Sequence, residues 1–207
     1  LARVGMTALV VGVLAAGCDA EKKITPPDPP SPYLEPSSPL NVLKNLQYAY
    51  EHKDSTAYAA VFTEDFTFVF NPDDVGNPDN PTPAEWDLED ELQAAGAMFG
   101  SQSVDDISLS WSIGEPDSSG AQNPQDPDTL AVRVDEIRLD VVHHRGDEIW
   151  IYKVQGATHW VHFLEDRSVT YAGDKHRWRV YRWLDSPIGA GKVEETTWGQ
   201  IKVNFGR

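Results

Sequence analysis

The sequence predicts an α+β fold in which three N-terminal helices pack on a curved antiparallel sheet. Apolar residues recur at helical spacing from position 38 to 62 and again from 82 to 99. From Ile107 onward apolar and polar residues alternate, which is typical of half-buried strands. The composition, with 40% hydrophobic residues and seven each of Trp, Tyr and Phe, can supply one sizeable core. Helices followed by a run of strands favour an α+β architecture.

The three helices have recognisable starts. Ser38 is a natural N-cap, and Pro39 suits the first helical position. Asp54 can cap a second, short helix that we expect to run through Phe62. Between the second and third helices, alternation predicts a strand at 65–70 with its phenylalanines on one face. We expect the third helix to begin at Thr82 and Pro83 and to end at Gly100.

The strands of the second half are predicted at 107–113, 130–141, 149–165 and 178–185. The apolar positions change parity between Val134 and Ile137, which predicts a β-bulge near Asp135–Glu136. Gly156 predicts a kink in the long third strand of this set. The pattern of residues 196–207 fits either a short helix or an edge strand.

The N-terminal residues form an apolar stretch that ends at the only cysteine, Cys18. Residues 6–17 carry no charge, and they are too few to span a bilayer core of about 30 Å as a helix. Small residues at 15–17 directly precede Cys18. One cysteine excludes an intramolecular disulfide and a Cys-rich zinc site. The segment resembles a bacterial lipoprotein signal, which implies that residues 1–17 are a cleaved signal peptide and that Cys18 receives acyl chains such as palmitate.

The next segment, residues 18–37, is predicted to be a spacer. Seven prolines lie between Pro26 and Pro39, and proline is excluded from helix interiors and central strands. Such a segment is extended, at about 3 Å per residue. We therefore expect residues 38–207 to form a domain held near a membrane through Cys18, in the bacterial cell envelope on its periplasmic or outer face.

The charge of the chain excludes one class of partner. It has 17 Lys and Arg against 33 Asp and Glu, for a net charge of −16. Such a surface repels phosphate backbones and anionic lipids, so we expect no nucleic acid partner. No phosphate-binding loop, dinucleotide fingerprint, nucleophile elbow or metal-binding helix motif is present, and we predict no cofactor.

Two passages resemble the NTF2-like superfamily, which includes SnoaL-type and ketosteroid-isomerase-type proteins. They are YEHKDSTAYAAVFTEDFTFVF (50–70), which follows the first helix, and the late strand WRVYRWLD (178–185). The resemblance spans residues 38 to 185. It implies a cone in which helices pack into a bent sheet around a pocket, with an acid–base pair there in some members. Dimers are common in that family, so a homodimer is one of the partners it implies.

Six residues are candidates for lining this pocket: His159, His162, Trp86, Trp111, Trp178 and Asp65. In a strand, His159 and His162 point to opposite faces, so they cannot bind one metal ion, and we predict no metal site. One of the two histidines is expected to face the pocket. Indole faces in a groove suit flat ligands, and Asp65 stands where the family often has an acidic residue. No position matches both parts of the isomerase-type Asp and Tyr arrangement, so we assign no catalytic residue.

Three functions follow as alternatives. The first is an anchored lipoprotein whose domain binds a small apolar or aromatic ligand, or a protein partner. The second is an isomerase, dehydratase or hydrolase of the SnoaL type, which requires at least two ionisable side chains converging in a closed pocket. The third is a scaffold without a pocket, in which the open face of the sheet or the long loops contact another protein.

Overall fold

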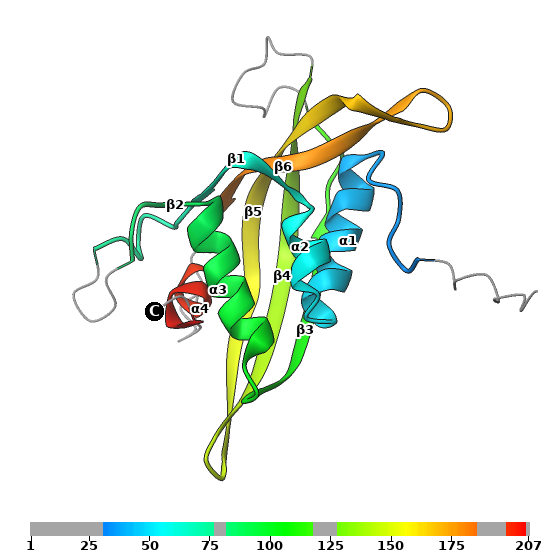
Figure 1. Ribbon diagram of the computed structural model, residues 1–207. Coiled ribbons are helices and arrows are strands. Elements are labelled where there is room, and N and C mark those ends of the chain that lie inside the picture. Colours follow the sequence, from blue (N-terminus) through cyan, green and yellow to red (C-terminus); the bar gives the residue numbers. More distant parts are fainter. Residues whose placement is uncertain (1–30, 77–81, 118–127, 186–197, 206–207) are drawn as a thin grey trace, which may run out of the picture. The chain divides into compact units, whose positions relative to one another are not determined.

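A computed structural model of the chain describes residues 31–76, 82–117, 128–185 and 198–205, and residues from Pro32 onward form one compact unit (Figure 1). The predicted signal peptide, Cys18 and most of the spacer lie outside the described residues. The elements in chain order are α1 (Pro39–Glu51), α2 (Ser55–Ala59), β1 (Phe62–Val69), β2 (Glu85–Asp87), α3 (Leu88–Gly100), β3 (Val104–Ile113), β4 (Thr129–Arg145), β5 (Glu148–Tyr171), β6 (Lys175–Asp185) and α4 (Trp198–Phe205).

The six described strands form one sheet in the order β2-β1-β6-β5-β4-β3. All neighbours are antiparallel except β1 and β6, which pair in parallel with Phe68 opposite Trp183. The sheet is therefore mixed, and the prediction of an antiparallel sheet was wrong at this pair. Parallel pairing needs a long connection, and α3 with strands β2 to β5 supplies it between β1 and β6.

The helix starts are set by side-chain caps. The Ser38 hydroxyl accepts a hydrogen bond from the Asn41 amide at 3.2 Å, as expected for α1. Helix α2 ends at Ala59, so Phe62 is already the first residue of β1 and not the end of the helix. Helix α3 begins at Leu88 rather than near residue 82, because Asp87 is its N-cap and accepts from the Asp90 amide at 3.0 Å. The residues just before it form β2 instead.

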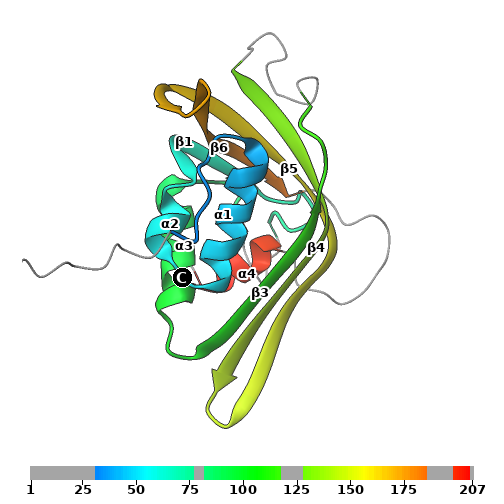
Figure 2. The same ribbon diagram turned by 90° about the vertical axis from the view of Figure 1, so that its right-hand side faces the viewer.

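The predicted break in β4 is confirmed. Val134 pairs with His159 and Ile137 with Ala157, so the register shifts between them, and Glu136 takes a positive φ of 53°. On the facing strand Gly156 has a φ of 72°, which only glycine adopts without strain. The bulge lets Val134 and Ile137 face the same core. The long β4–β5 pair is bent along its length (Figure 2).

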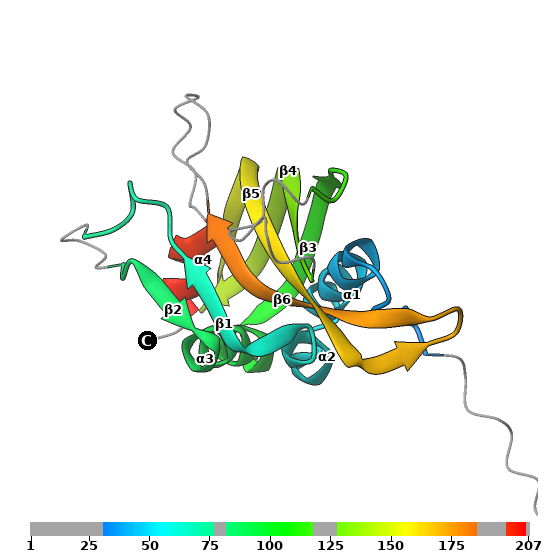
Figure 3. The same ribbon diagram turned by 90° about the horizontal axis from the view of Figure 1, so that it is seen from above.

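The helices cover one face of the bent sheet, as the view from above shows (Figure 3). The C-terminal residues that fitted either a helix or an edge strand form the helix α4, on the same face (Figure 2). Four of its side chains are buried: Trp198, Ile201, Lys202 and Val203. No helix among the described residues is long and apolar enough to cross a membrane.

A buried polar cluster and an apolar pocket

A buried lysine and a buried glutamate join α4 to α3. The Lys202 ammonium lies 2.7 Å from both carboxylate oxygens of Glu91, and Glu91 is fully buried. The Tyr58 hydroxyl of α2 donates to the same carboxylate. Burial lowers the pKa of Lys202, and the negative charge of Glu91 counteracts that shift. The ammonium also lies 3.7 Å from the centre of the Phe68 ring, a cation–π contact.

A histidine lies in the same interior, on β5. The Trp183 indole nitrogen donates to His159 Nδ1 at 2.7 Å, so Nδ1 is an acceptor and the ring proton of the neutral histidine belongs on Nε2. That Nε2 lies 3.0 Å from Asp185 Oδ1. Asp185 also attracts the charge of Lys202, which links this pair electrostatically to the Lys202–Glu91 pair. Acid and base groups therefore converge within the described interior.

Aromatic side chains fill the region around His159. The Trp198 ring of α4 lies 5.7 Å from the His159 ring and 5.5 Å from the Trp183 ring, measured between centroids. It stacks on Trp111 at 6.4 Å and contacts Tyr50 of α1 at 5.4 Å. Helix α4 thus places its own tryptophan directly beside the histidine.

A ligand-sized pocket lies elsewhere in the domain. Its volume is about 250 Å³, and it is lined by Tyr33, Leu34, Pro36, Val42, Asn45, Ala57, Ala60, Val61 and Trp178. Its walls thus come from the segment before α1, from α1 and α2, and from β6. Most of the lining side chains are apolar, which is typical of small-molecule sites.

The polar groups of the pocket wall are paired with each other. The Asn45 side chain donates to the Leu34 carbonyl at 2.7 Å and accepts from the Leu34 amide at 2.8 Å. The Tyr33 hydroxyl donates to Asp54 Oδ2 at 2.7 Å, and burial together with this bond raises the pKa of Tyr33. Asp54 in turn caps α2. These bonds hold the segment 33–36 against the helices, so the wall is formed before any ligand arrives.

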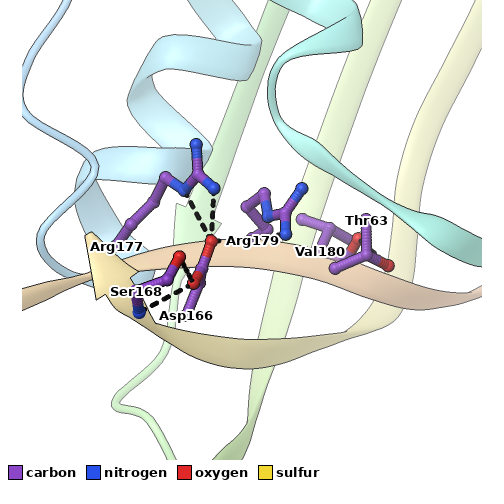
Figure 4. A network of polar contacts seen from close by, with 6 residues as sticks. All are labelled: Thr63, Asp166, Ser168, Arg177, Arg179 and Val180. Atoms are coloured by element: carbon purple, nitrogen blue, oxygen red, sulfur yellow. Dashed lines mark hydrogen bonds and ion pairs between the residues drawn. The ribbon is translucent and has the colours of Figure 1, made fainter.

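The strand that carries Trp178 is tied to the segment before α1 by a backbone hydrogen bond and to β5 by ion pairs. The Trp178 amide donates to the Pro36 carbonyl at 2.8 Å. Successive residues of a strand point to opposite faces, so Arg177 and Arg179 lie on the other face of β6 from Trp178. There Arg177 Nε lies 3.0 Å and an Arg179 nitrogen 3.4 Å from Asp166 Oδ2. Figure 4 shows the two arginines with Asp166 and Ser168. Hydrogen bonds from Ser168 and Arg177 lower the pKa of Asp166. This network joins β5 to β6 on the face opposite Trp178.

The structure separates the six predicted pocket residues. His159 and Trp111 lie in the interior that α4 fills, and Trp178 lines the pocket. Trp86 of β2 packs edge-on against Phe70 at 4.9 Å. Asp65 is exposed on β1 and lines neither place, because the neighbouring Phe66 takes the inward direction.

His162 lies on the face of β5 opposite His159, as the alternation of the strand requires, yet it is only 2% exposed. Among the described residues neither ring nitrogen has a hydrogen-bond partner. Burial, with a smaller contribution from the Arg182 charge, lowers the pKa of His162 to about 4. It is therefore neutral at pH 7.

Four residues of the buried polar cluster are not predicted from the sequence pattern: Glu91, Lys202, Tyr58 and Asp185. A signal existed for the first of these, because Glu91 lies among the apolar residues of α3, where a charge needs a partner. No spacing in the sequence indicates that the partner is Lys202, 111 positions away. Within the described ranges, no group of three or more His, Cys, Asp or Glu side chains could hold a metal ion.

No protein-family model and no curated protein sequence matches the chain. Solved structures do resemble it. A conserved protein from Planctomyces limnophilus is 15% identical with a TM-score of 0.49, over 71% of this chain and 91% of that one. An NTF2-like protein of unknown function from Shewanella oneidensis is 14% identical with a TM-score of 0.40, over 72% and 95%. A ketosteroid isomerase-like protein from Erwinia carotovora atroseptica is 18% identical with a TM-score of 0.42, over 75% and 97%. The structural neighbours of this α+β domain thus include NTF2-like and ketosteroid isomerase-like proteins.

Proposed function

We propose that this protein is a membrane-anchored lipoprotein whose NTF2-like domain binds a small apolar or aromatic ligand beside Trp178. The observation that carries the ligand proposal is the pocket of about 250 Å³ with a preformed wall. Cavities for drug-sized ligands start at about 300 Å³, so this pocket suits a ligand of one or two rings. The polar groups of the pocket wall already bond to other parts of the chain. A ligand would therefore be recognised by its shape and by apolar contacts.

Filling the pocket should abolish ligand binding. Ala57 lines the pocket and is half-buried, so Ala57→Leu places a larger side chain in the space a ring would take. We expect saturation-transfer NMR with naphthalene and indole as probes to lose its signal in this variant. Ala97→Leu, on the exposed side of α3, is the matched control and should bind as the wild type does. Equal binding by Ala57→Leu and the wild type would show that this pocket is not the ligand-binding site.

The anchor is supported by the apolar stretch before Cys18 and by the proline-rich spacer after it. Several acyl chains give stable membrane attachment, because each buried CH₂ contributes about 0.8 kcal/mol. We expect the wild-type chain to sediment with membranes when made in a bacterial host and the Cys18→Ala chain to be released into the soluble fraction. If both chains fractionate alike, the acyl anchor is wrong.

The second candidate function is acid–base catalysis of the SnoaL type. The observation that favours it is the convergence of His159 and Asp185 with the Glu91–Lys202 pair. It requires space for a substrate next to His159, where Trp198 now packs. Chemical-shift changes of the protein's own ring protons, followed while naphthalene or indole is added, separate the two functions. Shifts at His159 that survive Ala57→Leu would favour the interior site over the pocket.

A further inference from the structure

The tip of the β4–β5 hairpin exposes three consecutive large apolar side chains. Ile149 is 64% exposed, Trp150 46% and Ile151 49%. Only three other large apolar side chains in the described residues are comparably open to solvent, namely Leu34, Leu40 and Val75. Exposed apolar groups gathered in one place mark a contact surface, whereas scattered ones are ordinary.

The tip extends beyond the rest of the sheet (Figure 1). The pairing of β3 with β4 ends where Val104 meets His143, and past that point the hairpin is two-stranded, with His144 opposite Ile149 and Arg145 opposite Glu148. Ile149 lies in this two-stranded part, which has no core of its own. Trp150 and Ile151 lie at the end of the three-stranded part, opposite His143 and Val142, on the edge of β5 that β6 does not reach. All three side chains nevertheless remain about half or more exposed.

The apolar side chains occupy both faces of the ribbon. Successive residues of a strand point to opposite sides, so Ile149 and Ile151 share one face and Trp150 lies on the other. Trp150 faces the same side as Tyr152, which packs on Phe205 of α4. A rigid protein partner would cover one face of the ribbon, whereas a fluid lipid phase surrounds both.

We infer that the hairpin tip inserts shallowly into the uncharged interfacial region of a lipid bilayer. The inference rests on the proposed anchor, which brings the domain to a membrane. The patch comprises three residues, far fewer than the roughly 20–30 per side of a stable protein interface. Tryptophan favours the membrane–water boundary, where its ring is apolar and its N–H meets polar groups. In Trp150 that N–H donates to the Glu148 carboxylate at 3.2 Å.

The charges around the tip set the kind of lipid. Asp147 and Glu148 oppose a single arginine, Arg145, at the turn, and the whole chain carries −16. Anionic lipids would repel this surface. Zwitterionic lipids such as phosphatidylcholine do not, and acidic groups next to the apolar side chains keep insertion shallow. The tip thus supplies a second membrane contact that orients a domain held by a flexible anchor.

The test uses the full chain in phosphatidylcholine vesicles, in acylated wild-type form and as Cys18→Ala. Lipids brominated near the headgroup should quench the tryptophan fluorescence of both forms. The quenching should fall in Trp150→Phe, which removes the indole at the tip. In the Cys18→Ala background, Ile149→Ser with Ile151→Ser should reduce vesicle partitioning by about tenfold. The matched control, Leu40→Ser with Val75→Ser, removes two exposed apolar side chains elsewhere and should change nothing.

The outcomes separate the tip from the anchor. Equal quenching in wild type and Trp150→Phe, or equal partitioning by the tip and control variants, would overturn the inference even where Cys18 is acylated. Loss of membrane attachment in Cys18→Ala cells tests the anchor independently of the tip. Cross-linking to another protein or a second copy that depends on Ile149 and Ile151, without lipid quenching, would assign the tip to a protein partner and also overturn it.

Discussion

Replacing Lys202 with methionine should lower the free energy of unfolding by about 3–5 kcal/mol, because it leaves the buried carboxylate of Glu91 without its counter-charge. Glu91 is fully buried and Lys202 is 5% exposed, so water cannot replace the lost partner. The whole free energy of unfolding of a natural domain is about 5–15 kcal/mol, so this loss is a large fraction of it. Urea denaturation followed by circular dichroism measures it.

A double variant distinguishes loss of the ion pair from loss of packing. With Glu91→Gln added to Lys202→Met, no unpaired charge remains, and the carbonyl oxygen of the new side-chain amide still accepts from the Tyr58 hydroxyl. The double variant should therefore regain most of the lost stability. Lys153→Met on the exposed face of β5 is the matched control, expected within about 0.5 kcal/mol of the wild type. A double variant no more stable than Lys202→Met would show that the pair is not what holds α4 in place.

Acid should destabilise the domain through His162. Its pKa is about 4 in the folded chain and about 6.5 when unfolded, so the unfolded state binds more protons in this interval. The stabilisation that neutral His162 gives the folded state is fully present above pH 6.5. It is lost as the pH falls towards 4. The difference between the two pKa values lowers the free energy of unfolding by about 3 kcal/mol between pH 7 and pH 4. The free energy of unfolding, measured from pH 7 to pH 4, gives the slope.

His162→Leu should remove this part of the pH dependence, because it replaces the buried ring by an apolar side chain that needs no hydrogen bonds. The exposed His52 provides the matched control, and His52→Leu should leave the slope as it is in the wild type. An unchanged slope in His162→Leu would mean that other groups dominate the acid response. The carboxylates paired in the folded chain, Asp166 among them, then become the candidates, since their stabilisation is also lost in acid.

Local signals predicted the elements whose cause is local. A serine cap followed by proline predicts the start of α1, and alternating phenylalanines predict β1, because caps and alternation act within a few residues. The parity change at Asp135–Glu136 predicted the bulge for the same reason. The prediction that α3 begins at Thr82 and Pro83 is wrong, because pairing with Phe68 draws Trp86 into the sheet and the helix begins only at Leu88.

The sites depended on contacts between distant parts of the chain. The pocket brings Tyr33, Ala57 and Trp178 together from segments that no spacing relates. Of these three the sequence predicts only Trp178, and it does so through residue type alone. Likewise, the helical pattern of 196–207 could not be told from an edge strand, because burial by α3 and the interior tryptophans decides it.

The sequence by itself determined that His159 and His162 face opposite sides of one strand, because strand alternation is a property of the backbone. It also supplied the apolar stretch, Cys18 and the spacer, on which the anchor prediction stands. Only the tertiary structure decided that His159 is the inward one, bonded to Trp183 and facing Asp185, and that α4 fills the space beside it. Which face of a strand becomes interior depends on what packs against it, and here that is a helix from the end of the chain.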